Sequence, residues 1–384
     1  AVRRFIGLMS GTSIDAVDGA LLEIGGEPPR ALRTAAFASR PIPEDLRREL
    51  EALQSPGADE LARAALAANA LAGVYADVVA DLLAGAGCPA ASVTAIGAHG
   101  QTIRHRPELG YTIQLLQPAR LAEACGIAVV CDLRAADVAA GGQGAPLAPA
   151  FHAEAFRDAI ERRAVVNLGG IANISVLPAF GSPEPVTGFD TGPANTLLDA
   201  WCRRHTGTDF DRDGDWGRGG KVDAALLASW LADPYFALAP PKSTGRDLFD
   251  LGWLDRSLTA GAVAGPANGT PGTERNPRDV QATLVELTAV TVGRACRESG
   301  AERVFVCGGG ARNRFLMERL AVNAAPAQVT TTQALGVDPQ AVEAAAFAWL
   351  AARRIDGMAG NLASVTGARG PRVLGLLADP RPRN

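Results

Sequence analysis

The chain has 384 residues, of which 47 % are apolar and 20 % charged, and its formal net charge is -4. One hydrophobic core seldom organises a chain of this length, so we expect two domains. The small acidic charge and the lack of a clustered basic face argue against a nucleic-acid partner. The six cysteines form no CxxC pair and the four histidines show no zinc spacing, which favours a cytoplasmic protein with reduced thiols.

The longest apolar stretch, residues 61–87, is rich in alanine but is broken by an arginine, an asparagine and two aspartates. A membrane span needs about 20 apolar residues with few charges, so we predict a helix of a soluble protein and no membrane partner. The N-terminus begins like a signal peptide, AVRRFIGLMSG, but its apolar run is short and Asp15 and Asp18 follow. We therefore reject a signal peptide.

The first half of the chain opens with a strand, a Gly-rich turn and a second strand. Apolar runs and turn residues predict strands at 4–9, 16–24, 32–38, 93–98 and 127–131, and helices at 43–53, 59–86 and 121–125. The polar segment HGQTIRHRP, residues 99–107, is predicted to be a loop.

The second half repeats this opening of strand, Gly-rich turn and strand. Its predicted strands are 163–168, 174–177, 187–189 and 304–307, and its predicted helices are 195–205, 222–232, 280–299, 314–322 and 340–354. The Pro/Gly-rich stretch 261–277 is predicted to be a surface loop. Two similar α/β halves facing each other would form a cleft, which is a common ligand site.

The first motif is SGTSIDAVD, residues 10–18. Gly11 permits a tight turn, and Thr12 and Ser13 offer hydroxyl and N–H groups to phosphate oxygens. Asp15 and Asp18 are suited to holding Mg²⁺ directly or through water. The alternative is an ordinary hairpin built from turn-favouring residues. No lysine follows the glycine, so the motif is not a Walker A loop.

Two further glycine motifs lie in the second half. In NLGGIAN, residues 167–173, Gly169 and Gly170 leave the backbone open, and the motif is the counterpart of the first hairpin. Alone it would be a structural turn, whereas paired with the first hairpin it indicates a phosphate clamp. VFVCGGGARN, residues 304–313, places three glycines between a strand and a helix, where a flat ligand or a phosphate can approach.

Several single polar residues are candidates for chemistry. Asp190, in GFDTGPAN, ends an apolar strand and is suited to act as a general base or to cap the next helix. His99 follows a buried strand and is either a substrate ligand or a structural histidine. Arg134 is suited to clamp a carboxylate or to form a structural ion pair. Glu343 lies in an apolar helix, facing solvent or substrate, and Lys242, in PPKSTGRD, receives no role.

Ten segments in this order resemble the anhydro-N-acetylmuramic acid kinase family, within the superfamily of actin, hexokinase and chaperone ATPases. They are FIGLMSGTSIDAVD, AIGAHGQTIRH, GGQGAPLAPAFH, VVNLGGIANIS, GFDTGPANTLLDAW, PPKSTGRDLF, QATLVELTA, VFVCGGGARN, EAAAFAWLA and GNLASVTGA. The chain departs from the family pattern at Ala16 and Ala194, where an added methyl replaces a glycine.

The resemblance implies two ribonuclease-H-like domains facing each other across a nucleotide cleft. The first domain would comprise residues 1–133 and 340–384, and the second 134–339. It also implies ATP and Mg²⁺, for which Asp15 and Asp18 are the candidate ligands, and a homodimer. The long helix 59–86 is our candidate for the dimer contact. The ATP ligands would be Gly11, Thr12, Ser13, Ile14, Asp15, Ala16, Val17, Asp18, Gly169, Gly170, Asn173, Gly308, Gly309, Gly310 and Asn313.

By the same resemblance, Asp190 would be the catalytic base, and Arg134, Glu343 and His99 would contact the sugar. The implied reaction opens 1,6-anhydro-N-acetylmuramic acid with water and phosphorylates O6, as a step of peptidoglycan recycling. One alternative is a conventional sugar or acyl kinase in which Asp190 deprotonates a free hydroxyl. Another is a nucleotide-driven interaction protein, and a third is a catalytically silent sensor of the sugar.

Overall fold

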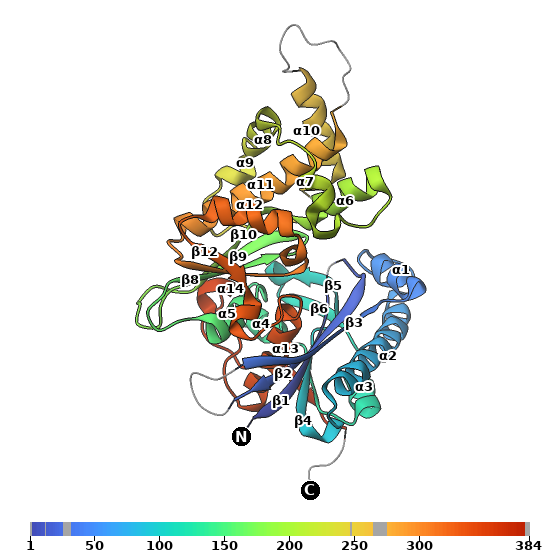
Figure 1. The fold of residues 1–384 in the computed structure, drawn as a ribbon. Coiled ribbons are helices and arrows are strands. Elements are labelled where there is room, and N and C mark those ends of the chain that lie inside the picture. Colours follow the sequence, from blue (N-terminus) through green and yellow to red (C-terminus); the bar gives the residue numbers. More distant parts are fainter. Residues whose placement is uncertain (1, 12, 26–31, 246–247, 264–274, 381–384) are drawn as a thin grey trace. The chain divides into compact units, whose positions relative to one another are not determined.

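The computed structural model describes the chain except for residues 1, 12, 26–31, 246–247, 264–274 and 381–384 (Figure 1). The chain divides into two compact units, one formed by residues 1–155 and 335–384 and the other by 156–334. Residues 134–155 and 335–339 were predicted in the second domain but lie in the first unit. The reason is long-range bonding: Asp137 Oδ1 accepts hydrogen bonds from Asn361 at 2.6 Å and Thr366 at 2.7 Å.

The first unit contains a six-stranded sheet, a two-stranded sheet and the helices around them. Its strands are β1 Arg3–Ser10, β2 Ala16–Ile24, β3 Leu32–Pro41, β4 Val93–Ala98, β5 Gln101–Arg106, β6 Tyr111–Leu115, β7 Val129–Cys131 and β13 Leu376–Ala378. Its α-helices are α1 Glu44–Ala52, α2 Glu60–Ala86, α3 Pro118–Cys125, α4 Ala135–Ala139, α5 Ala148–Phe156, α13 Val342–Ile355 and α14 Ala363–Thr366.

The six-stranded sheet has the order β13-β7-β4-β1-β2-β3. Strands β1, β2 and β3 form an antiparallel meander, while β4 runs parallel to β1 and β7 runs parallel to β4. This is the ribonuclease-H-like arrangement that the sequence analysis predicted for each half.

Helices α13 and α2 cover opposite faces of this sheet (Figure 1). Gly7 and Gly97 are register partners on β1 and β4, and the backbone of α13 lies directly over them. On the other face, Gly19 leaves room for Val78 and Leu82 of α2. By length and composition α2 could cross a membrane, but it buries one side against the sheet, as a core helix does.

The segment 99–107 was predicted to be a loop, and that prediction was wrong. Residues 101–106 form β5, which pairs in an antiparallel hairpin with β6. Gln101 and Ile103 are buried while Arg104 is half-buried, so the strand carries only one large apolar side chain toward the core. A polar strand of this kind has little of the alternation by which strands are recognised in a sequence.

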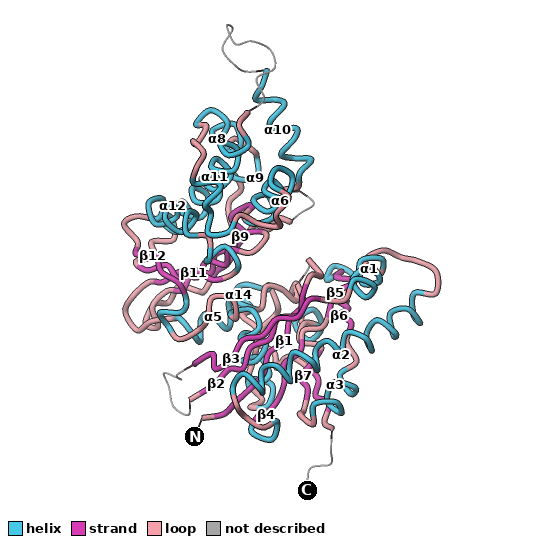
Figure 2. Tube along the Cα trace, turned by 45° about the vertical axis from the view of Figure 1, so that its right-hand side comes forward, coloured by secondary structure: helices cyan, strands magenta, loops and turns pink. Residues whose placement is uncertain are grey.

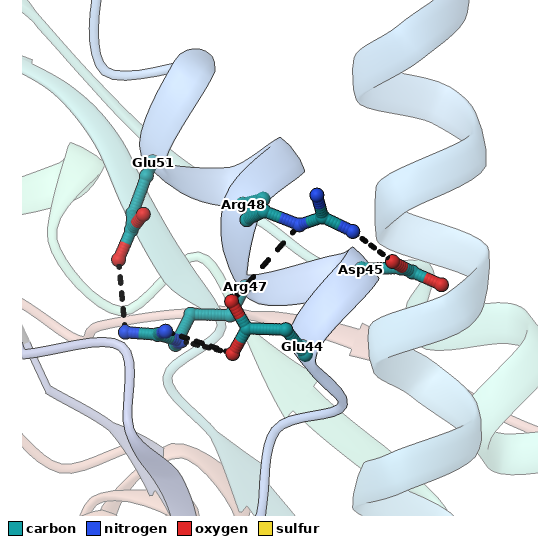
Figure 3. A network of polar contacts seen from close by, with 5 residues as sticks. All are labelled: Glu44, Asp45, Arg47, Arg48 and Glu51. Atoms are coloured by element: carbon teal, nitrogen blue, oxygen red, sulfur yellow. Dashed lines mark hydrogen bonds and ion pairs between the residues drawn. The ribbon is translucent and has the colours of Figure 1, made fainter.

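Helix α1 stays on the surface and carries a network of ion pairs on its exposed side (Figure 3). Arg47 pairs with Glu44 at 2.7 Å and with Glu51 at 3.4 Å, and Arg48 pairs with Asp45. These are contacts between residues three or four positions apart, which stabilise a helix by only a few tenths of a kcal/mol each. Burial of Leu50 is therefore the main anchor of the helix.

The second unit repeats the architecture of the first. Its strands are β8 Arg163–Leu168, β9 Ile171–Leu177, β10 Thr187–Pro193, β11 Arg303–Cys307 and β12 Gln328–Thr331. Its α-helices are α6 Asn195–Thr206, α7 Asp215–Arg218, α8 Ala224–Leu231, α9 Pro234–Ala237, α10 Leu251–Val263, α11 Pro277–Glu298 and α12 Arg314–Ala324. Most of the predicted loop 261–277 lies outside the described residues, and α10 reaches Val263.

The sheet order of the second unit is β10-β9-β8-β11-β12. Strands β8, β9 and β10 are antiparallel neighbours, and β11 runs parallel to β8 and to β12. This matches β3-β2-β1-β4-β7 of the first unit, so the predicted internal repeat is confirmed. Helices α11 and α12 cover one face of the sheet (Figure 2), where the apolar side chains of the unit gather. The other face carries buried Val165 and Phe305 together with the half-buried polar residues Asn167, Asn173 and Asp190.

Candidate active site

The first Gly-rich hairpin joins β1 to β2. The N–H of Ile14 donates to the Gly11 carbonyl at 3.2 Å, and the Gln101 side chain donates to the same carbonyl, also at 3.2 Å. A Cβ on Gly11 would meet only the Ser13 hydroxyl, at 3.9 Å, so the glycine leaves the backbone accessible. Asp15 is exposed in the turn. Thr12, which was predicted to bind phosphate, lies outside the described residues.

The remaining residues of this hairpin that were predicted to bind ATP differ in which of their groups a ligand can reach. The side chains of Ile14 and Val17 are buried in the core of the first unit, so only their backbone is available to a ligand. Ala16 pairs with Pro41 of β3 and is half-buried. Asp18 lies inside β2, where burial raises its pKa and a hydrogen bond with Ser39 lowers it.

The second hairpin, between β8 and β9, is braced by the start of α6. The Gly169 carbonyl accepts from the Asn195 N–H at 3.1 Å, and the Gly170 carbonyl accepts from the Ala194 N–H at 3.0 Å. The Asn195 side chain donates to the Leu168 carbonyl at 3.0 Å. The GPAN motif therefore fixes the shape of the hairpin. The methyl group of Ala194 is buried and points away from solvent.

The three-glycine motif follows β11 and leads into α12. A Cβ on Gly308 would lie 2.3 Å from Asn167 Oδ1, and one on Gly310 would lie 2.6 Å from the Leu168 side chain. Close packing against the second hairpin thus requires these two glycines. Asn313 caps α12, because its side-chain oxygen accepts from the Leu316 N–H at 2.9 Å. Gly309 has Asn195 as its neighbour, at 3.4 Å from a built Cβ.

Asp190 belongs to a row of polar side chains that crosses three strands. It is the register partner of Asn173 on β9, which in turn is the partner of Asn167 on β8. Directly opposed residues of neighbouring strands share one face of a sheet, and all three side chains are half-buried. Phe189, the preceding residue, packs against the apolar core on the other face. The strand thus presents Asp190 on the face opposite to α11.

Two features of the surroundings of Asp190 have opposite effects on its pKa. Burial raises the pKa of its carboxyl group, and a hydrogen bond that Oδ2 accepts from the Thr244 N–H, at 3.0 Å, lowers it. Among the described residues, Oδ1 accepts no hydrogen bond that would compete with a water molecule. A half-buried carboxylate with one oxygen anchored and the other available has the form expected of a general base.

The three residues predicted to contact a sugar lie together in the first unit. Arg134 Nε donates to His99 Nε2 at 2.9 Å, and Arg134 Nη1 donates to the Gly144 carbonyl at 2.7 Å. Burial lowers the pKa of Arg134 to about 10, and the charge of Glu343 acts to raise it. Burial and the Arg134 charge lower the pKa of His99 to about 3, so this ring is neutral and accepts through Nε2.

Asp137 organises the loop beside Arg134 and was not singled out as a functional residue from the sequence. Its Oδ2 accepts from the Gly144 N–H at 2.8 Å, and a Cβ on Gly142 would lie 2.2 Å from the same oxygen. Because Asp137 also binds Asn361 and Thr366, the GNLASVTGA segment supports the loop that holds Arg134. Gln101 lies in the segment 99–107 that was expected to be a loop, and its hydrogen bond to the first hairpin was not foreseen.

In the part of the chain that the structure describes, no group of three or more His, Cys, Asp or Glu side chains is arranged to hold a metal ion. The six cysteines are free thiols. Mg²⁺ in nucleotide sites commonly uses one or two carboxylates together with phosphate oxygens and water. Exposed Asp15 is compatible with that mode, whereas Asp18 is engaged by Ser39.

Comparison with known proteins gives consistent matches over nearly the whole chain. A family model described as anhydro-N-acetylmuramic acid kinase matches residues 3–379. The anhydro-N-acetylmuramic acid kinase of Bordetella petrii is 56 % identical over 379 residues, covering 98 % of this chain and 96 % of the relative. That of Cupriavidus pinatubonensis is 53 % identical over 380 residues, covering 97 % and 98 %.

Solved structures resemble the chain more distantly. The activator of the 2-hydroxyisocaproyl-CoA dehydratase from Clostridium difficile, with bound ADPNP, is 14 % identical with a TM-score of 0.46, covering 92 % of this chain and 97 % of that one. A ROK family glucokinase from Streptomyces griseus, in complex with glucose and AMPPNP, is 14 % identical with a TM-score of 0.37, covering 90 % and 98 %.

Proposed function

This chain belongs to the anhydro-N-acetylmuramic acid kinase family, and we propose that it uses ATP to convert 1,6-anhydro-N-acetylmuramic acid into N-acetylmuramic acid 6-phosphate. The reaction serves the recycling of peptidoglycan. The observation that carries this proposal at the level of the site is Asp190, a half-buried carboxylate on a polar strand face with one oxygen anchored by Thr244. The chain is accordingly a phosphotransferase with an alcohol group as acceptor.

Asp190 acts as the general base toward water. In the anhydro-sugar O6 is bonded to C1 and carries no proton, so the base takes its proton from a water molecule that attacks C1. The C1–O6 bond breaks, O6 becomes the nucleophile, and it bonds to the γ-phosphorus of ATP while ADP leaves. Water thus supplies the new hydroxyl at C1, and its second proton ends on Asp190. One carboxylate near C1 suffices, in contrast to the pair of an ordinary glycosidase.

The two hairpins bind the phosphate groups of ATP. Their glycines fit this role, because a Cβ at Gly11 or Gly169 would meet no atom closer than 3.4 Å, which leaves the backbone N–H groups accessible. The Ser13 hydroxyl adds a donor at the first hairpin. Positioning and charge stabilisation dominate phosphoryl transfer, so the hairpins contribute by fixing the γ-phosphate in line with O6. The glycines 308–310 lie beside the adenosine in this arrangement.

The sugar is bound by Arg134, Glu343 and His99. Arg134 is already oriented by His99 and Gly144, so little conformational freedom is lost when it pairs with the lactyl carboxylate. Glu343 is exposed at the start of α13, where it accepts hydrogen bonds from sugar hydroxyls.

Mg²⁺ accompanies the nucleotide, with Asp15 as the better placed of the two predicted carboxylate ligands. When bound, the ion neutralises charge on the phosphate oxygens. The protein is cytoplasmic, in keeping with its free thiols. It forms a homodimer through α2, whose first turns carry Leu61 at 90 % and Leu66 at 69 % exposure.

The test is turnover of purified protein with ATP, Mg²⁺ and the anhydro-sugar, compared with Asp190→Asn. The variant keeps the size of the side chain and its acceptor oxygen but cannot take a proton. We expect it to lose about 100-fold or more in kcat while retaining ATP affinity. Asp255→Asn, which changes a surface carboxylate paired with Arg204, is the matched control. Normal turnover of Asp190→Asn would rule out its role as the base.

A further inference from the structure

Asp190 is held from outside its sheet by the segment 235–244. It lies on β10, at the edge of the described sheet. On the outer side its N–H donates to the Lys242 carbonyl at 3.1 Å, and its carbonyl accepts from the Tyr235 hydroxyl at 2.7 Å. An edge strand leaves such groups unpaired unless another segment covers them. Residues 235–244 therefore satisfy the backbone groups of Asp190 that a neighbouring strand would otherwise bond.

The same segment also holds the carboxylate. Two residues after Lys242, the Thr244 N–H donates to Asp190 Oδ2 at 3.0 Å. This bond fixes the rotamer of Asp190 and favours its ionised form, since it lowers the pKa that burial raises. Any change that moves Thr244 away from Oδ2 must weaken Asp190 as a base at low pH.

Lys242 ties the two ends of this segment together. Its ammonium group donates to the Tyr235 carbonyl at 3.3 Å and lies 4.8 Å from the centroid of the Tyr235 ring. The Tyr235 ring is itself buried and meets Phe236 and Phe249 edge to face, at 5.7 and 5.5 Å. The lysine side chain thus ties its own loop to this aromatic cluster. Lys242 and Tyr235 also each bond to the backbone of Asp190.

The other groups around Lys242 do not replace this contact. Lys242 lines a cavity of about 310 Å³ together with Arg294 and Glu298 of α11. Among the described residues, no carboxylate oxygen lies within the 4.0 Å of an ion pair with its ammonium. Burial lowers the pKa of Lys242, the charge of Glu298 raises it and that of Arg294 lowers it. Burial and the charge of Asp190 raise the pKa of Tyr235, which therefore stays protonated as a donor.

We propose that Lys242 is a positioning residue for the general base, holding the Thr244 N–H on the Asp190 carboxylate through its contacts with Tyr235. This rests on the proposed function, in which Asp190 takes a proton from water. Lys242 is not among the residues that we assign to the sugar or the nucleotide. Its loss should therefore affect proton transfer and leave the binding of ATP unchanged.

The test compares three variants. Lys242→Met removes the charge and keeps the length, Lys242→Arg keeps a cation able to stack on Tyr235, and Lys221→Met changes the other lysine of the chain as the control. We expect Lys242→Met to lower kcat about tenfold or more, with KM for ATP unchanged and a larger loss at about pH 6 than at about pH 8. Lys242→Arg should recover most of the loss, and Lys221→Met should behave as wild type.

A titration followed by ¹³C NMR of aspartate carboxyl groups separates this proposal from the proposed function. Wild-type protein without turnover would refute the proposed function, whereas a higher Asp190 pKa in Lys242→Met would still support the positioning role. If Lys242→Met fails to fold, Lys242→Gln, which replaces the lysine by a shorter, neutral and polar side chain, should lower kcat in the same way. Wild-type kcat at both pH values, or an unchanged Asp190 titration, would overturn the proposal.

Discussion

The glycine pair under α13 gives a quantitative test of how the first unit is packed. A Cβ added to Gly7 would lie 1.7 Å from the Ala344 carbonyl oxygen and 2.4 Å from the Ala348 nitrogen. Contacts under 3.0 Å do not occur for real Cβ atoms, and here the obstacle is helix backbone. Gly7→Ala must therefore push α13 away from the sheet by more than 1 Å, a distance given by the difference between 3.0 and 1.7 Å.

The expected cost follows from overpacking, which commonly destabilises a core by about 1–3 kcal/mol. Because a backbone atom cannot rotate away, we expect about 3 kcal/mol for Gly7→Ala, measured by urea unfolding of the ligand-free protein. The displaced carbonyl is adjacent to Glu343, so KM for the sugar should rise as well. Gly73→Ala is the control, since its Cβ would meet nothing within 4 Å and alanine favours a helix by about 1 kcal/mol.

The two substitutions make the same chemical change and should shift stability in opposite directions. Equal stability of Gly7→Ala and wild type would refute the direct contact between α13 and the sheet. A loss of stability in Gly73→Ala as large as that in Gly7→Ala would refute the reasoning from local space.

Two further predictions concern pH and assembly. Burial lowers the pKa of His152 to about 3, below its value in the unfolded chain. Between about pH 3 and 6.5 the unfolded chain therefore binds more protons than the folded protein. The free energy of unfolding falls as the pH drops through that window. At about pH 5 this histidine should cost roughly 2 kcal/mol, and His152→Gln should show a shallower decline in urea unfolding; an identical slope would contradict the burial. The double substitution Leu61→Arg and Leu66→Arg should convert a dimer to a monomer, as measured by light scattering. Turnover of the variant checks that it still folds. An unchanged molar mass would exclude α2 from the dimer interface.

Much of the fold was predictable because its strands are apolar and its turns are rich in glycine. Strand 93–98 and strand 163–168 were predicted with the bounds that the structure gives them, and the repeat of hairpins led to two similar sheets. The hairpin β5–β6 was missed because its strand is polar. The boundary at residue 134 was misplaced because Asp137 reaches Thr366 across 229 positions, a contact that local patterns do not contain.

The candidate site was predictable only in part for similar reasons. Asp190 was recognised from its place at the end of a strand and from the resemblance of the chain to the family. Its alignment with Asn173 and Asn167 could not be predicted, because it depends on how the strands pair. The glycines at 308 and 310 were interpreted as space for a ligand, yet contacts with Asn167 and Leu168 already require them. Lys242 received no role, since its link to Asp190 runs through backbone groups whose partners a sequence does not specify.

In the proposed mechanism, water opens the anhydro ring while O6 receives the phosphate. The most direct measurement runs the reaction with ATP and the anhydro-sugar in ¹⁸O-labelled water and analyses the product by mass spectrometry and NMR. The proposed mechanism predicts a product with one label at C1 and a phosphate on O6, and a large loss of this product with Asp190→Asn. A phosphorylated product that keeps the anhydro bridge, or one without label at C1 immediately after formation, would contradict it.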